Sequence, residues 1–265
     1  MTPRAQLYAD ALTALKLWRV WTFLGVQDIK ARFRRSFIGP LWILLNLGFF
    51  VGGAGFVYGV MFGQPMAEFL PFLITGFVIW GFLLSSFVEA GTAFVVSEGY
   101  IKQFSYPKQI YLLRALVSYG INMLIGFAAV VIMQFAFHNF GLVAWLMALP
   151  GIAILIFAAQ GHIIISAYVG TKFRDLPFAF SGILQVIFFV TPIMFPIDVL
   201  KAKGIDFVYR YNPLYYLIDI VRRPILEGSF PPFENYALAI LYVLLVWIVA
   251  AATARRLDNR VVFLL

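Results

Sequence analysis

Long stretches without a charged side chain are the feature that most restricts how this chain can fold. No Asp, Glu, Lys or Arg occurs between Arg35 and Glu68, between Glu68 and Glu89, or between Arg114 and Lys172. A helix needs about 20 apolar residues to cross the hydrocarbon of a bilayer, and a charge inside it is costly. The composition agrees, because 63% of the residues are hydrophobic and 12% are charged. The sequence therefore predicts an all-α polytopic membrane protein.

The neutral stretches divide into six predicted transmembrane helices. The stretch after Arg114 is long enough for two helices, and the polar point from His138 to Gly141 predicts a hairpin between them. Residues 1–265 together are predicted to form one transmembrane domain. The predicted spans are residues 37–62, 69–88, 115–137, 142–169, 176–197 and 235–254.

The basic residues predict the orientation of the bundle. With both termini in the cytoplasm, the cytoplasmic segments hold 15 of the 20 Lys and Arg residues, and the outer segments hold Lys201, Lys203, Arg210, Arg222 and Arg223. Cytoplasmic loops of membrane proteins are enriched in these residues. We therefore expect cytoplasmic N and C termini. The net charge of +8 is explained by topology and by contact with anionic membrane lipids, not by nucleic acid.

Three further segments are predicted to lie at the membrane surfaces. Residues 1–36 mix apolar residues with cations, which is typical of an interfacial helix, although a plain basic flank has a similar composition. Residues 97–114 predict a cytoplasmic loop with one short helical turn ended by Pro107. In the outer segment, residues 198–234, Asn212-Pro213 predicts the start of a helix that rests at the outer interface or dips into the membrane. Its apolar residues at helical spacing are Leu214, Leu217, Ile218, Val221 and Ile225.

The sequence contains no pattern typical of an active site. No Gly-Lys dipeptide occurs, so the phosphate-binding loop G-x-x-x-x-G-K-[ST] is absent, and we expect neither ATP binding nor enzymatic activity from this chain alone. No metal site is predicted. The spans hold few ionisable residues, which argues against a proton-driven transporter. His162, in the fourth span, is either a functional residue, as an ionisable group inside a membrane suggests, or a neutral hydrogen-bonded packing residue, which is the favoured interpretation. Glu89 lies where the second span meets the cytoplasm.

A stripe of small residues runs along the first span. Gly48, Gly52, Gly55 and Gly59 predict close helix packing without indicating the partner helix. Aromatic residues make up 18% of the chain and suit a channel that stacks against sugar rings, but aromatic belts at the membrane interfaces use the same residues.

Taken in order, the segments resemble the membrane subunits of ABC-2-type transporters, in particular the O-antigen and capsular polysaccharide exporters. The resemblance covers nearly the whole chain. Its motifs are Asp28 to Ser36 followed by Gly39-Pro40-Leu41-Trp42, Tyr100-Ile101-Lys102 to Tyr106-Pro107, Arg174-Asp175, Thr191-Pro192-Ile193 and Asn212-Pro213-Leu214.

This resemblance implies a permease subunit that exports a lipid-linked polysaccharide across the bacterial inner membrane. It implies six helices per subunit, a re-entrant outer segment and a homodimer around a central channel. Two copies of a separate ATPase subunit would bind ATP and Mg²⁺ and dock on the cytoplasmic face. The residues implied in that contact, besides the interfacial helix, are Tyr100, Ile101, Lys102, Tyr106, Pro107, Arg174 and Asp175.

The cations Arg32, Arg34 and Arg35 lead to a hypothesis about the substrate. Cations at the inner interface suit phosphates, so these three are expected to attract an anionic lipid-pyrophosphate headgroup where the substrate enters. Other functions stay open: an ABC-2 exporter of teichoic acid, a drug or a small lipid, or a membrane-embedded glycosyl or acyl transferase.

Overall fold

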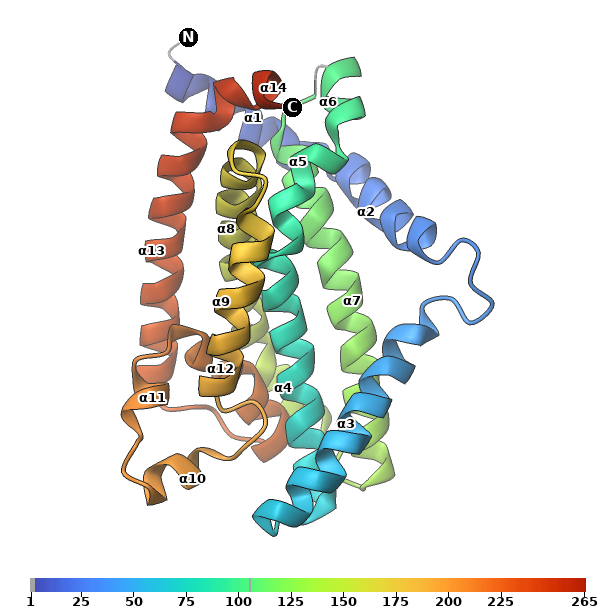
Figure 1. The fold of residues 1–265 in the computed structure, drawn as a ribbon, viewed down its shortest axis with the longest axis vertical. Coiled ribbons are helices and arrows are strands. Elements are labelled where there is room, and N and C mark those ends of the chain that lie inside the picture. Colours follow the sequence, from blue (N-terminus) through green and yellow to red (C-terminus); the bar gives the residue numbers. More distant parts are fainter. Residues whose placement is uncertain (1–2, 105) are drawn as a thin grey trace.

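The computed structural model describes residues 3–104 and 106–265 as a helical bundle, and that part of the chain contains no strand. Five of its helices are long and apolar enough to cross a membrane, as predicted for a polytopic protein (Figure 1): α3 (Leu41–Phe62), α4 (Met66–Phe87), α7 (Gln109–Ala136), α8 (Leu142–Lys172) and α13 (Phe233–Leu257). The sixth predicted span is α9 (Leu176–Val190), whose 15 residues rise about 22 Å. A hydrocarbon core is about 30 Å thick, so the count of six spans stays a prediction.

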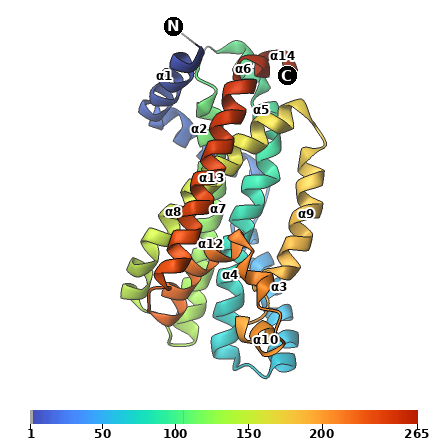
Figure 2. The ribbon, with the colours of Figure 1, turned by 90° about the vertical axis from the view of Figure 1, so that its left-hand side faces the viewer.

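The shorter helices gather at the two ends of the bundle (Figures 1 and 2). The end that carries both chain termini, called the termini end below, holds α1 (Pro3–Lys16), α2 (Trp18–Arg32), η1 (Glu89–Thr92), α5 (Ala93–Val96), α6 (Glu98–Gln103), η2 (Asp258–Arg260) and α14 (Val261–Leu264). The opposite end, called the far end, holds α10 (Ile197–Ala202), α11 (Phe207–Arg210) and α12 (Pro213–Glu227).

The N-terminal segment differs from the single interfacial helix that was predicted, because it forms two helices that meet at Leu17. Helix α2 packs closely on α7, where a Cβ added to Gly25 would lie 2.7 Å from Val117 Cβ. Leu12 and Phe23 on the outer side of this segment are exposed, as expected for a surface that rests on lipid. Met1 and Thr2 of the predicted helix, and Ser105 of the predicted loop, lie outside the described residues.

Two helix ends differ from the predicted spans for identifiable reasons. Helix α9 ends at Val190, not near residue 197, because Thr191 precedes a proline and adopts an extended conformation with ψ 133°. Helix α7 begins at Gln109, six residues before the predicted span, and continues through Arg114. Arg114 lies within this helix and pairs with Asp28 of α2.

Helix α8 lies at the centre of the bundle and uses glycines to approach its neighbours. Gly151 lies directly against the backbone of α12 at Ile220, and Gly170 lies against the backbone of η1 at Gly91. A side chain at either glycine would collide with backbone atoms that cannot rotate away. Small residues therefore set the distances between these helices.

The predicted glycine stripe of α3 divides into two halves. Gly55 and Gly59 are buried against α4, and a Cβ added to Gly59 would lie 2.8 Å from Met66 Cε. Gly48 and Gly52 have no atom within 4 Å of an added Cβ. Within the described chain, the first half of α3 is thus left open to whatever surrounds the subunit.

His162 is a hydrogen-bonded packing residue, which confirms its interpretation from sequence. It is 1% exposed, and its ring stacks on Phe87 with 3.9 Å between centroids. Its Nδ1 lies 3.2 Å from Ser86 Oγ, and its Nε2 lies 2.8 Å from Tyr242 Oη. The residue thereby joins α4, α8 and α13 through a satisfied polar contact, which a buried polar group requires.

Helix α12 begins as predicted, with the Asn212 side chain accepting a hydrogen bond from the Leu214 backbone N–H at 3.1 Å and Pro213 in the first turn. The apolar positions predicted to share one face are all buried. The burial extends further than the stripe, since Asp219 and Arg222 are only 5% and 4% exposed. The helix therefore dips among α4, α8 and α13 and does not rest on the surface.

Candidate functional site

The short helix α6 forms a protruding arm at the termini end (Figure 1). Tyr100, Phe104 and Tyr106 are 43%, 49% and 45% exposed, although they are large apolar side chains. Their rings form a continuous row, with centroids 6.4 Å apart between the first two and 6.0 Å between the last two. On the same helix, Lys102 pairs with Glu98 at 2.5 Å in solvent. Exposed aromatic residues with a charged border are typical of a surface that docks another protein.

The turn between α8 and α9 is the second exposed element at this end. Arg174 and Asp175 are both exposed there, as the predicted second contact requires. The start of α9, beyond the turn, packs against η1, because a Cβ added to Gly91 of η1 would lie 2.8 Å from Pro177 Cγ. The two predicted contact elements lie at the same end of the bundle, and we call them together the coupling surface: α6, the chain to Pro107, and the α8–α9 turn.

Arg114 connects the arm to the interfacial helix α2. Its Nε and Nη2 donate to the two carboxylate oxygens of Asp28 at 2.7 and 2.5 Å, which is a bidentate ion pair. The guanidinium also lies 5.5 Å from the Tyr100 ring centroid, and Nη1 donates to Ser97 Oγ at 3.4 Å. Arg114 of α7 therefore contacts both α6 and α2, and Tyr100 of α6 also lies near Tyr111 of α7, with 6.5 Å between ring centroids.

Asp258, in the C-terminal segment, anchors the other side of the arm. Lys108 Nζ, just before α7, donates to Asp258 Oδ2 at 3.0 Å and to its backbone carbonyl at 2.5 Å. The Tyr168 hydroxyl of α8 donates to Asp258 Oδ1 at 2.6 Å. The chain between α6 and α7 is thus tied to the C-terminal segment through Lys108, while Arg114 ties α7 itself to α2.

The three arginines predicted to meet a headgroup are placed differently from one another. Arg32 Nη2 lies 3.4 Å from Glu89 Oε2 in a half-exposed ion pair, so its charge is partly compensated. Both residues line a polar pocket of about 330 Å³ that also includes Asp28. Arg34 and Arg35 are exposed in the turn that leaves α2. These two remain available to an anionic group at the membrane surface.

Sequence reasoning did not identify Asp28, Arg114 and Asp258 as parts of the site. A signal for the first was present, since Asp28 is the one acidic residue between Asp10 and Glu68 and lies among basic residues. Its partner is 86 positions away, and Asp258 is 150 positions from Lys108. Pairings over such separations follow from the fold and have no local pattern.

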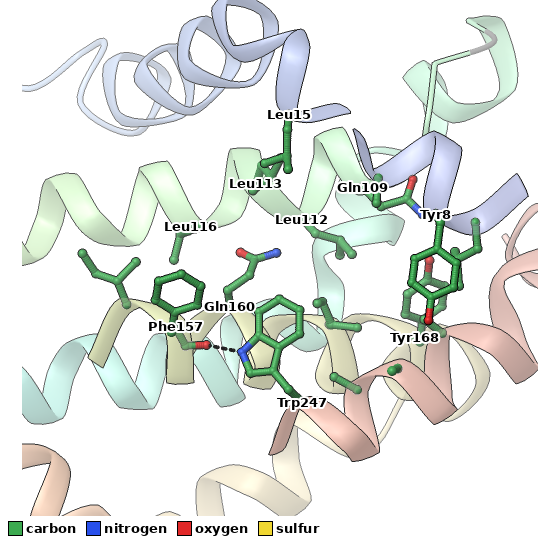
Figure 3. Close-up of a pocket in the computed structure, with 17 residues that line it drawn as sticks. Tyr8, Leu15, Gln109, Leu112, Leu113, Leu116, Phe157, Gln160, Tyr168 and Trp247 are labelled. Atoms are coloured by element: carbon green, nitrogen blue, oxygen red, sulfur yellow. Dashed lines mark hydrogen bonds between the residues drawn. The ribbon is translucent and has the colours of Figure 1, made fainter. Parts of the chain in front are cut away.

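An apolar groove of about 510 Å³ runs along the side of the bundle near the coupling surface (Figure 3). It lies between α1, α7, α8 and α13, and Leu15 and Phe157 are among its lining residues. Trp247 Nε1 donates to the Phe157 carbonyl at 3.0 Å and closes part of its floor. This lining suits a hydrocarbon chain and offers few partners to a sugar.

Comparison with known proteins agrees with this architecture. The profile of the ABC-2 type transporter family matches residues 19–226. The chain is 27% identical over 219 residues to the O-antigen export system permease protein RfbA of Klebsiella pneumoniae, covering 82% of each chain. It is 24% identical to RfbA of Myxococcus xanthus over 83% of this chain and 86% of the relative. It is 22% identical to the polysialic acid transport protein KpsM of Escherichia coli over 77% and 80%, respectively. With its polytopic helical bundle and a family profile that spans most of its length, the chain belongs to the ABC-2 type transporter family.

Proposed function

We propose that the chain is the membrane-spanning permease subunit of an ATP-driven exporter that moves a lipid-linked polysaccharide of the O-antigen or capsule type across the bacterial inner membrane. The observation that carries the proposal is the coupling surface, where an exposed aromatic arm and the exposed α8–α9 turn stand at the same end of a polytopic bundle. The relatives named for O-antigen export and polysialic acid transport support the class of substrate.

In this proposal the termini end faces the cytoplasm and docks two copies of a separate ATPase subunit. ATP and Mg²⁺ bind to that subunit, and this chain supplies no catalytic residue. The row of Tyr100, Phe104 and Tyr106 would enter a recess of the ATPase, and Arg174 would form a second, polar contact. Closure of the ATPase pair then pushes the arm.

The push is passed on through Arg114. Because its guanidinium contacts the arm at Tyr100 and the interfacial helix at Asp28, movement of α6 shifts α2 relative to α7. An eight-residue turn leads from α2 into α3, and Gly48 and Gly52 in the first half of α3 face open space. A shift of α2 therefore displaces α3, and a homodimer that encloses its channel partly with α3 would open. Lipid-linked substrate would approach the exposed Arg34 and Arg35 by its phosphates.

A docking experiment tests the proposal. The full chain is co-expressed with an ATPase encoded beside it, and Tyr106→Ala is compared with Tyr211→Ala, which removes an equally large exposed ring at the far end. We expect Tyr106→Ala to lose co-purification of the ATPase and glycan export, while Tyr211→Ala keeps both. An ATPase that co-purifies equally with both variants would refute the assigned docking surface.

A second measurement tests the substrate. Cells that lack the chain are expected to accumulate lipid-linked polysaccharide on the cytoplasmic side, and the wild-type chain should restore its export. Accumulation of teichoic acid or of a small lipid in place of a polysaccharide would instead point to another ABC-2 substrate. Transfer of a sugar or acyl group by the isolated chain would contradict the transport function.

A further inference from the structure

A second polar cavity, of about 620 Å³, lies at the far end of the bundle, opposite the coupling surface. Helices α4, α10 and α12 supply most of its walls. Its charged lining residues are Glu68, Asp198, Lys201, Asp219, Arg222, Arg223 and Glu227. The export mechanism described above uses none of these residues.

Arg222 is the unusual member of this group, because it is 4% exposed and lacks a full set of partners. Its Nη1 is completely buried and has no hydrogen-bond partner among the described residues. The nearby Asp219 carboxylate is already engaged, by Arg223 at 3.2 Å and by Asn235 at 2.7 Å. A guanidinium carries five N–H donors, and stacking on Phe72 with 4.0 Å to the ring centroid leaves the donors of Nη1 unsatisfied.

The position of Arg222 makes this arrangement costly. Its Nη1 lies 3.3 Å from the point where a Cβ of Gly76 would stand, and Gly76 is ten residues into α4 from the far end. At the rise of an α-helix this is about 15 Å from the start of α4. An ionised side chain at such depth is strongly disfavoured unless it is paired or serves a ligand.

The remaining charges indicate what the ligand carries. Arg223 pairs with Asp219, and Lys201 pairs with Asp198 at 3.4 Å. These pairs leave Arg222 deep in the cavity and two exposed carboxylates, Glu68 and Glu227, among the lining residues. A simple anion would satisfy the arginine but would meet two carboxylates. A group with a phosphate and an ammonium a few ångströms apart satisfies both charges.

We propose that this cavity binds the phosphoethanolamine headgroup of a phospholipid from the outer leaflet. The phosphate accepts hydrogen bonds from Arg222, and the ammonium group donates to Glu227 and Glu68. In this arrangement the phosphate lies inside the cavity, where Arg222 is buried, and the ammonium lies at its exposed edge, where Glu68 and Glu227 stand. A lipid bound in this cavity would link α12 to α4, whichever substrate the protein exports.

Native mass spectrometry of the full chain in detergent tests the proposal. Phosphatidylethanolamine, phosphatidylglycerol and inorganic phosphate are titrated separately. We expect phosphatidylethanolamine to bind at least about tenfold more tightly than phosphatidylglycerol, and Arg222→Gln to weaken it by a similar factor, as for loss of a charge-assisted hydrogen bond. Arg210→Gln is the matched control, because that arginine lies exposed at the same end and pairs with Asp206 at 2.7 Å.

The carboxylates provide a test that does not depend on the folding of an Arg222 variant. Glu68→Gln combined with Glu227→Gln is expected to reduce the preference for phosphatidylethanolamine over phosphatidylglycerol to about onefold to threefold, because the double variant leaves the ammonium group without either carboxylate partner. Equal binding of the two lipids by the wild-type chain would overturn the proposal. So would displacement of the lipid by millimolar inorganic phosphate, or unchanged binding by a folded Arg222→Gln protein.

Discussion

The ion pair between Asp28 and Arg114 makes a quantitative prediction. Replacing Asp28 with Asn removes the charge that compensates Arg114, whose side chain is 11% exposed against 31% for Asp28. Hydrogen bonds to charged groups contribute about 1.5–3 kcal/mol, whereas fully exposed pairs contribute about 0.2–1 kcal/mol. Because this pair is bidentate and only partly exposed, we expect Asp28→Asn to lower the free energy of unfolding by about 2 kcal/mol.

Thermal unfolding of the purified full chain in detergent measures this effect. A loss of 2 kcal/mol corresponds to a decrease in melting temperature of about 4–8 °C for a chain of this size. The matched control is Lys102→Gln, which breaks the exposed pair with Glu98 and is expected to change the free energy by no more than about 0.5 kcal/mol. Combining Asp28→Asn with Arg114→Gln should cost less than the sum of the single changes, by about 2 kcal/mol. Strictly additive effects, or equal shifts for the pair and the control, would refute the reasoning.

Three further predictions concern helix starts and packing, each measured by the melting temperature of the purified chain. Asn212→Ala removes the cap of α12 and should lower the free energy of unfolding by about 1 kcal/mol, and an unchanged melting temperature would contradict the role of the cap. Gly170→Ala should cost about 1–3 kcal/mol because its Cβ would collide with the backbone of Gly91, whereas Gly52→Ala, with open space around it, should leave the melting temperature unchanged; the reverse order would contradict the packing of α8 against η1. His162→Phe should cost about 1–3 kcal/mol, since two buried hydroxyl partners lose their hydrogen bonds, and a neutral result would remove the structural role.

Much of the architecture follows from local features of the chain. The transmembrane helices were predicted because charge-free stretches of sufficient length have no stable place in water, and this holds whichever neighbours they contact. The start of α12 was predicted because the cap at Asn212 and the proline after it act within four residues. The predicted end of the fifth span is wrong, because apolar residues continue beyond Val190 but the Thr191-Pro192 pair favours an extended backbone and ends α9 there.

The coupling surface was predicted only in part. Its exposed residues, such as Tyr100 and Arg174, were expected from the order of segments along the chain, and the structure places them at one end of the bundle. Their connection was not predicted. Gly91 of η1 and Gly170 of α8 meet by backbone contact, and no local residue pattern predicts that two particular glycines will meet.

By itself, the sequence determined that the chain is a polytopic helical bundle, because partitioning between water and hydrocarbon depends on each segment alone. The tertiary structure decided which charges are paired. Asp28 meets Arg114 across 86 positions, while Arg222, one residue from the paired Arg223, is buried with an unsatisfied donor. The physical reason is that an ion pair depends on which helix faces meet, and in an almost uniformly apolar chain many arrangements of the helices satisfy the hydrocarbon equally well.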